Sequence, residues 1–235
     1  MACRFDGQAL NGSKAWVAGA VGADQLLVVA QNNSQPVLVV LDADGKGIYA
    51  EPRRQSDGSQ LCDIGFVDAP AKVLAEGSVV SEALSGVVAD ATALAAAELV
   101  GVSAKALELT LDYVKTREQF GKPIGSFQVI QHRAVDLYVS QQVAEAGVSE
   151  ALARMHVCTD PRARTREASR AKARACSTAK KITRESIQLH GAVGYTDEFD
   201  VGLFLNRALV LSAWLGDAAY HRAQWMDAVE AKADD

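Results

Sequence analysis

The sequence predicts an α+β protein, mainly α, in which a small antiparallel β-domain precedes an antiparallel four-helix bundle. Residues 8–75 contain short runs rich in valine and leucine, separated by turn-forming residues, which is the pattern of strands. From about Ser78 onward alanine, leucine, glutamate and arginine dominate, and the apolar residues recur with a helical period. We therefore expect two domains, a partial β-domain over residues 1–77 and a bundle over residues 78–235, with no strand after residue 90.

The composition is that of an ordinary soluble globular chain. It has 235 residues, of which 49% are hydrophobic and 23% charged, enough to bury a core. The net charge of −5 argues against a nucleic-acid partner, because nucleic acids select basic surfaces. No apolar run reaches the roughly 20 residues that cross a bilayer, and the first residues lack the basic segment and apolar core of a signal peptide. We expect a cytoplasmic protein with no membrane partner.

The cysteines and histidines do not indicate a metal site. The four cysteines have no C-x-x-C spacing, and the four histidines form no ligand cluster in the sequence. We therefore expect no bound metal and reduced thiols at Cys3, Cys62, Cys158 and Cys176.

Five strands are expected in the β-domain, at residues 8–17, 25–30, 36–41, 48–52 and 61–67. Within the first of them, Asn11-Gly12 is a strong hairpin-turn signal. Short strands at this spacing predict a small sandwich or barrel, although five strands are few for a closed barrel.

The bundle is expected to contain long helices at residues 81–117, 124–156, 161–190 and 217–231, with a short helix near 201–209. Gly121 fits a helix C-cap and Pro123 fits the first turn of the next helix, so an elbow should lie at Gly121–Pro123. The third helix begins with a basic run. We interpret that run as a solvated helix face, because no aromatic residues interleave with it and the chain is acidic overall.

The elbow presents Arg117, Phe120 and Gln128. Taken alone, it is a helical hairpin with a solvated arginine. The stretch DYVKTREQFGKPIGSFQVIQ, however, contains R-x-x-F-G-x-x-I-x-x-F-Q, and this motif resembles that of the acyl-CoA dehydrogenase family. The matching residues are Arg117, Phe120, Gly121, Ile124, Phe127 and Gln128.

A glycine loop follows the third helix, from Gln188 to Gly194. Closely spaced glycines let the backbone approach a flat or anionic ligand, although a helix C-cap explains one glycine equally well. The loop resembles the family's Q-x-x-G-G-x-G stretch, with Ala192 in the second glycine position. The resemblance implies that Gln188, Gly191 and Gly194 contact the adenosine and pyrophosphate end of FAD from a neighbouring subunit.

The first expected strand contains LNGSKAWV, which taken alone is a hairpin with a core tryptophan. It resembles the family's L-N-G-x-K-x-W-I-T-N-G strand, which implies that Trp16 lies near the flavin. Ala18 stands where the family has a threonine that bonds the flavin, and Gly19 replaces an asparagine. We therefore expect FAD binding to be weak in this chain alone, or shared with a partner chain.

The resemblance covers essentially the whole chain, and TREQFGxPIGSFQ places it near members acting on steroid side chains or other bulky acyl-CoAs. Two departures accompany it. The family's N-terminal helical domain and first β-segment are not in this sequence, and the family's catalytic glutamate position is Leu215. An alternative base position used by some members falls at Ala91. The substitutes nearby are Asp217, expected to cap the last helix and so to be a weak base, and Asp90.

Three interpretations remain open from the sequence. The chain is a subunit of an acyl-CoA dehydrogenase, catalysing α,β-desaturation of an acyl-CoA with FAD, that completes a site in a homologous partner or a homo-oligomer. Alternatively it is an autonomous FAD dehydrogenase with Asp217 or Asp90 as its base. The third interpretation is an inactive truncated or wrongly started remnant, acting at most as a structural or interaction module.

Overall fold

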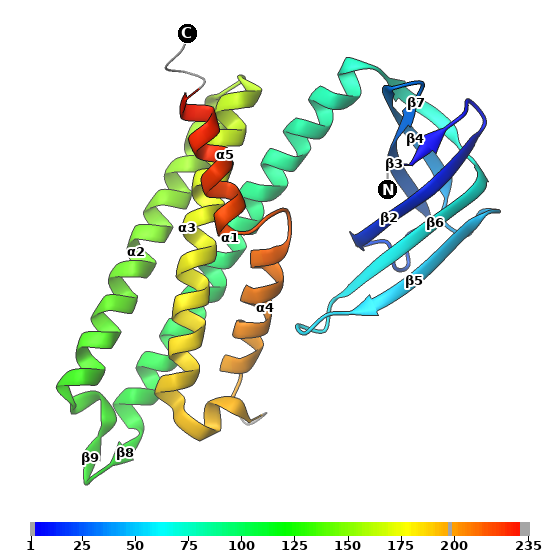
Figure 1. Cartoon of the computed structure of the whole chain (residues 1–235). Coiled ribbons are helices and arrows are strands. Elements are labelled where there is room, and N and C mark those ends of the chain that lie inside the picture. The colour runs from blue at the N-terminus through cyan, green and yellow to red at the C-terminus, as the bar shows by residue number, and fades with distance from the viewer. Residues whose placement is uncertain (1–2, 197–198, 231–235) are drawn as a thin grey trace. The chain divides into compact units, whose positions relative to one another are not determined.

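The computed structural model describes residues 3–196 and 199–230. The chain divides into two compact units, Met1–Ser85 and Gly86–Asp235, here called the β-unit and the helical unit. Figure 1 shows the β-unit in blue to cyan and the long helices in green to red. The expected α+β class is confirmed, and each unit is described by itself.

The β-unit is a seven-stranded sheet in the order β5-β6-β2-β1-β3-β4-β7. All neighbouring strands are antiparallel except β1 and β3, which are parallel. The five expected strands are present; the short strands β1 and β7 were not predicted. Because β5 and β7 are edge strands in the described sheet, it is not a closed barrel. The strands are β1 (Arg4–Phe5), β2 (Ala9–Ala18), β3 (Gln25–Asn32), β4 (Gln35–Asp42), β5 (Ile48–Arg54), β6 (Gln60–Pro70) and β7 (Lys72–Glu76).

The hairpin expected at Asn11-Gly12 is wrong. These two residues lie inside β2, where the register against β6 shifts between Leu10 and Gly12, which is a β-bulge. A tight turn instead joins β3 to β4 at Asn33 and Ser34, whose φ values are 45° and 70°. Two consecutive positive φ values give a turn whose twist matches the flanking strands.

Alternation along the strands places the core on one face of the sheet. In β3, Leu26, Val28 and Ala30 are buried, whereas Leu27 is 67% exposed. Side chains two residues apart point to the same face of a strand, so a continuous apolar run buries only every second residue here. The buried cluster comprises Cys3, Phe5, Leu10, Leu26, Val28, Ala30, Val37, Val39, Leu41, Cys62, Ile64, Phe66 and Ala69.

The helical unit is organised around α3, which contacts α2, α4 and α5 (Figure 1). Asp160 caps the start of α3 by accepting from the N–H groups of Arg162 and Ala163, and Gly191 ends it with a φ of 68°. The helices are α1 (Ser78–Thr116), α2 (Gln128–Val157), α3 (Pro161–His190), α4 (Val201–Ala213) and α5 (Ala218–Glu230), with 3-10 helices η1 (Ile124–Ser126) and η2 (Gly191–Tyr195).

The elbow between α1 and α2 is more elaborate than expected. Helix α1 ends at Thr116, and two-residue strands β8 (Glu118–Gln119) and β9 (Lys122–Pro123) form a hairpin before η1. Phe120 and Gly121 make its turn, with φ values of 57° and 76°. Gly121 is therefore a hairpin residue and not a helix cap, and the expectation of no strand after residue 90 is wrong. The interruption of the helix before Pro123 is as expected.

The basic run of α3 is not wholly a solvated face. Lys172 is 0% exposed, and its Nζ donates to the carbonyl oxygens of Trp214 at 2.6 Å and Gly216 at 3.1 Å. Burying an ammonium group requires such partners, because an unpaired buried charge is strongly unfavourable. The interpretation as a solvated face is wrong at this position.

By length and composition, two stretches could cross a bilayer, which corrects the expectation that no such run exists. They are Ser78–Thr116 and Val201–Asp227, whose apolar windows are 39% and 28% buried. The second stretch is interrupted between α4 and α5. Helix α1 places Leu99 and Ala106 in the cores of the helical unit, which explains its apolar composition.

The cysteine side chains are all free thiols. Cys3, Cys62 and Cys176 are buried, and Cys158 is partly exposed. Among residues 3–196 and 199–230, no three histidine, cysteine or acidic side chains gather as a metal-binding group.

Gly47 offers a test of the sheet geometry. Its φ is 80°, and a Cβ there would lie 2.1 Å from the carbonyl oxygen of Val67. Gly58 has a similar φ of 83°, but a Cβ there would meet no atom closer than an Arg54 nitrogen at 3.8 Å. We expect Gly47→Ala to lower the free energy of unfolding of the β-unit by about 3 kcal/mol, and Gly58→Ala by about 1 kcal/mol. Urea unfolding followed by circular dichroism measures both; equal losses would contradict the close approach of Gly47 to the Val67 carbonyl oxygen.

Candidate functional site

An open hollow of about 550 Å³ lies where the C-terminal ends of α1 and α3 meet the start of α4. We call it the elbow hollow. Its volume is in the range of small-molecule sites. It brings Arg117, from the elbow motif, close to His190, which directly precedes the glycine loop. The lining residues are Leu109, Asp112, Tyr113, Thr116, Arg117, His190, Phe199, Asp200 and Val201.

An aromatic cluster joins the two motifs. The rings of Tyr113 and His190 are stacked with centroids 4.2 Å apart, and Phe199 packs edge-on against both. The Tyr113 hydroxyl donates to the carbonyl oxygen of His190 at 3.3 Å. The His190 Nδ1–H donates to the Ser186 carbonyl oxygen at 2.7 Å. Burial lowers the pKa of His190, opposed by that Ser186 bond, so the hollow has a neutral aromatic wall near pH 7.

Arg117 is the cation of the elbow hollow. Its backbone N–H bonds to Tyr113 and its carbonyl oxygen accepts from Ile124 at 2.8 Å, so both neighbouring segments fix its backbone. Its side chain is exposed and has no hydrogen-bond or ion-pair partner among the described residues. The guanidinium is therefore free to bind an anionic group. The acidic residues Asp112 and Asp200 also line the hollow and repel anions, so we expect an anionic group to bind beside Arg117.

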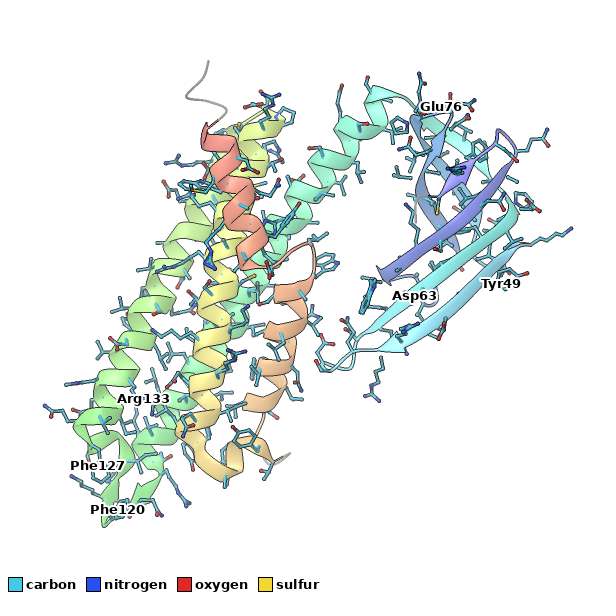
Figure 2. The ribbon with its side chains drawn as sticks, viewed as in Figure 1. Tyr49, Asp63, Glu76, Phe120, Phe127 and Arg133 are labelled. Carbon is cyan, nitrogen blue, oxygen red and sulfur yellow. The ribbon has the colours of Figure 1, made fainter. Side chains whose placement is uncertain are left out.

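Phe120 projects from the tip of the β8–β9 hairpin and is 91% exposed. Its ring is perpendicular to that of Phe127, with the centroids 6.1 Å apart, and the Lys122 Nζ lies 4.3 Å from the Phe127 ring (Figure 2). Neither Phe120 nor the exposed Gln128 lines the elbow hollow. The Phe120 ring is therefore accessible at the hairpin tip, on a left-handed backbone.

The glycine loop has internal reasons for its glycines. A Cβ on Gly194 would lie 2.9 Å from the Ile187 carbonyl oxygen, so this glycine lets η2 pack on the end of α3. Gly191 takes a positive φ at the end of α3 and has open space around it. Gln188 is exposed and its carbonyl accepts the Gly191 N–H. Of the two glycines in the loop, Gly191 is the one that has both a positive φ and open space in which a ligand could approach the backbone.

In the β-unit, Trp16 is 71% exposed and has a φ of 61°, so it is not the core tryptophan of a hairpin. Its backbone N–H donates to Asp63 Oδ1 at 2.9 Å, at a second register shift of β2 between Lys14 and Val17. A hollow of about 360 Å³ lies beside it, bordered by Lys14, Tyr49 and Asp63 among others (Figure 2). Ala18 ends β2 and Gly19 follows in the turn, so neither offers a side-chain hydrogen bond.

The turn between α4 and α5 holds Leu215, at the expected position of the base. Leu215 has a φ of 60°, and its carbonyl oxygen accepts from His221 Nε2 at 3.0 Å. Lys172 donates to the carbonyls on either side, at Trp214 and Gly216. Three consecutive carbonyls are thus held by two buried side chains, so the backbone geometry of the turn does not depend on the side chain at 215.

Both substitute bases are engaged elsewhere. The Asp217 carboxylate accepts from the N–H groups of Ala219 at 3.0 Å and Tyr220 at 2.8 Å, which confirms the expected cap of α5. The Tyr220 bond in particular lowers the pKa of Asp217. Asp90 forms an ion pair with Arg164, which also donates to the carbonyl oxygen of Cys158 at 3.2 Å. Ala91, at the alternative position, has no ionisable group.

Sequence reasoning missed five residues of this region: Tyr113, His190 and Phe199 in the elbow hollow, and Lys172 and His221 under the α4–α5 turn. Tyr113 stands four residues before Arg117, a spacing that places both residues on one helix face. This spacing is the one sequence signal that could have placed Tyr113 in the site. The other contacts join segments far apart in the chain, which periodicity does not show.

The comparisons with known proteins agree with this fold. Residues 84–229, more than half of the chain, match the family described as "Acyl-CoA dehydrogenase, C-terminal domain". The chain belongs to the acyl-CoA dehydrogenase family. Over 123 residues it is 44% identical to "Acyl-CoA dehydrogenase IpdE2" of Mycobacterium tuberculosis, covering 52% of this chain and 36% of that protein. Over 238 residues it is 28% identical to "Isovaleryl-CoA dehydrogenase, mitochondrial" of Solanum tuberosum, covering 94% and 57%.

Solved structures show the same architecture. The "Tcur3481-Tcur3483 steroid ACAD", solved as a variant, superposes with a TM-score of 0.86 at 28% identity, covering 99% of this chain and 63% of that one. The ChsE4-ChsE5 complex from Mycobacterium tuberculosis gives 0.85 at 23% identity, covering 97% and 62%, and shows the fold alone. The chain spans less than two thirds of the length of each of these relatives.

The buried His221 predicts a pH-dependent stability. Burial, followed by the nearby Lys172 charge, lowers the pKa of His221 below 6.5 in the folded chain, and burial acts likewise on His190. The unfolded chain therefore binds more protons as the pH falls below 6.5, so the stability of the helical unit falls with it.

We expect the melting temperature of the helical unit to drop between about pH 7.5 and about pH 5.5, and His221→Gln to remove roughly half of that drop. Glutamine keeps an N–H donor for the Leu215 carbonyl but does not titrate. His132→Gln, at an exposed position on α2, is the matched control and should leave the drop unchanged. A pH dependence identical in wild type and His221→Gln would contradict the assignment.

Proposed function

We propose that this chain is a subunit of an FAD-dependent acyl-CoA dehydrogenase that lends its elbow hollow to a homologous partner chain. The observation that carries the proposal is the meeting of Arg117 and the end of α3 in one open hollow, in a chain whose base position is Leu215. In this proposal the chain supplies the cofactor part of a site and the partner supplies the proton acceptor. The expected substrate is an acyl-CoA, and its bulky or steroid character is proposed from the likeness to the steroid ACAD.

Three features of the described residues suit parts of an FAD molecule, two in the helical unit and one in the β-unit, and each is considered by itself. The unpaired Arg117 guanidinium suits a pyrophosphate, because arginine binds phosphate oxygens through charge-assisted and often bidentate bonds. The open backbone at Gly191 leaves space for the same end of the molecule. The exposed indole of Trp16 supplies a flat surface for a ring. When bound, FAD supplies the two-electron acceptor.

The remaining work falls to this chain's residues. Tyr113 and His190 hold the wall beside Arg117 and exclude water from one side of the hollow. Phe120 and Gln128, exposed near the elbow, are proposed to contact the partner or its cofactor. Removal of the α-proton requires a base within hydrogen-bond reach. We propose that a carboxylate of the partner chain takes this proton, since Leu215 has no ionisable group.

We propose that α2 carries a surface for the partner. Val135, Val139 and Val143 are exposed at four-residue spacing, with Tyr138 beside them, which forms an apolar stripe on one helix face. Such stripes on an exposed helix favour pairing with another protein surface. The solved ChsE4-ChsE5 complex supports a pairing of two homologous chains as the arrangement to test first. A cytoplasmic location remains a proposal from the sequence.

Arg117 is the residue that we expect to govern flavin retention. The loss of a hydrogen bond between charged groups weakens binding by roughly tenfold to a hundredfold. We expect weak FAD binding by this chain alone, stronger binding with the homologous partner, and a loss of that size in Arg117→Gln. Arg184→Gln, an exposed position on α3, is the control. The flavin absorbance of the purified complex measures retention; full retention in Arg117→Gln would exclude Arg117 from the cofactor site.

The missing base predicts that the isolated chain does not oxidise acyl-CoAs, even with added FAD. The capping bonds of Asp217 and the ion pair of Asp90 engage both carboxylates. A dye-coupled assay across small and bulky acyl-CoAs, with and without the partner, measures this. Turnover by the chain alone that disappears in Asp217→Asn or Asp90→Asn would establish a substitute base and overturn the proposal. No turnover and no flavin in any complex would favour the inactive module.

A further inference from the structure

A second hollow, of about 410 Å³, lies between α3 and α5 and shares no residue with the elbow hollow. We call it the α3–α5 hollow. Its lining contains hydrogen-bond donors and no carboxylate, which is the lining that an anion requires. The residues are Arg170, Ala173, Arg174, Ser177, Arg222 and Trp225.

The guanidinium groups of this hollow differ in their partners. Arg170 is bound to Glu150 at 3.0 Å and to Glu167 at 3.0 Å, so its charge is offset. Arg174 and Arg222 are exposed and form no hydrogen bond or ion pair among the described residues. The indole N–H of Trp225 also has no hydrogen-bond partner among residues 3–196 and 199–230. In the part of the chain that the structure describes, no hydrogen bond or ion pair therefore neutralises the charges of Arg174 and Arg222.

The surroundings strengthen this positive potential. Helix α3 carries nine lysine or arginine residues and two glutamates, in a chain whose net charge is −5. Asp217 offsets part of this potential, because after the Tyr220 and Ala219 N–H bonds the charges of Lys180 and Arg222 lower its pKa further. The Asp217 carboxylate is already used to cap α5, so it competes weakly for Arg222. A concave surface of one charge concentrates counter-ions.

We propose that the α3–α5 hollow binds the phosphate groups of a nucleotide. Arg174 and Arg222 face it from two helices and can bind phosphate oxygens from both sides. Trp225 forms a half-buried flat wall on which an attached base stacks. The volume suits a ligand of nucleotide size and is too small for a duplex.

Calorimetric titration of the full chain with ADP tests this site. We expect binding that weakens about tenfold or more in Arg174→Gln and in Arg222→Gln. The control variant Arg184→Gln, elsewhere on α3, should bind ADP as wild type does, and Arg117→Gln reports any ADP bound at the elbow hollow instead. Circular dichroism confirms that each variant is folded. ADP binding that is lost in Arg117→Gln and kept in Arg174→Gln and Arg222→Gln would overturn the proposal. Absence of ADP binding at millimolar concentration would also overturn it, unless coenzyme A binds through Arg174 and Arg222.

Additional ligands identify the source of the nucleotide. Coenzyme A contains an ADP unit, so binding of coenzyme A that requires Arg174 and Arg222, without binding of free ADP, would assign the site to a coenzyme. Pyrophosphate binding as tight as ADP would show that Trp225 adds nothing and would reject the stacked base. An oligonucleotide that binds more tightly than ADP would replace the proposal with a nucleic-acid surface. The titrations contain neither FAD nor partner chain, so a failure to bind ADP leaves the proposed dehydrogenase function untouched. A failure of the dehydrogenase assay likewise leaves the proposed nucleotide site untouched.

Discussion

Small side chains along one face of α3 set how closely the helical unit packs. Ala168, Ala171, Ala175 and Ala179 are all buried, at spacings of three and four residues that keep them on one stripe. Alanine adds little bulk, so α2, α4 and α5 approach this helix closely. The hydroxyl of Thr183, also buried, bonds back to the Ala179 carbonyl and needs no outside partner. Every site described above is built on this helix or at its C-terminal end, except the surfaces of the β-unit, of the β8–β9 hairpin and of α2.

The buried Lys172 shows how that packing positions the α4–α5 turn. Two backbone carbonyls satisfy its ammonium group, and His221 holds the carbonyl between them. Burial lowers the pKa of Lys172, a measure of how far the group is removed from water. Because these bonds engage the backbone, the turn keeps its geometry with leucine at position 215. The geometry of this turn is therefore compatible with leucine at the position where the resemblance places the base.

Backbone strain marks the same places as the family motifs. Among the described residues, six non-glycine residues have a positive φ, and three of them are Trp16, Phe120 and Leu215. The resemblance implies a cofactor contact for Trp16 and Phe120 and places the catalytic base at the position of Leu215. Left-handed backbone at such bulky residues costs about 1–3 kcal/mol and persists where surrounding contacts hold it. Strain retained at Leu215 indicates that the surrounding bonds, more than the side chain, determine this conformation.

The sequence by itself determined the class and order of the parts. Valine-rich runs between turns predicted five of the strands, helical periodicity predicted the long helices, and three motifs identified the family. Each of these signals depends on the spacing of residues within one short segment. A short segment can, however, fit more than one local structure: Asn11-Gly12 suits a hairpin turn and a bulge equally, and Gly121 suits a helix cap and a hairpin.

The tertiary structure alone decided which distant residues meet. Tyr113 and His190 are far apart in the chain and stack because α1 and α3 end at the same place. Lys172 belongs to a basic run that suggests solvent, and it is buried because its face of α3 lies under the α4–α5 turn. The α3–α5 hollow likewise arises only when α5 folds back beside the arginines of α3. Such contacts depend on helix packing, which no spacing along a single segment encodes.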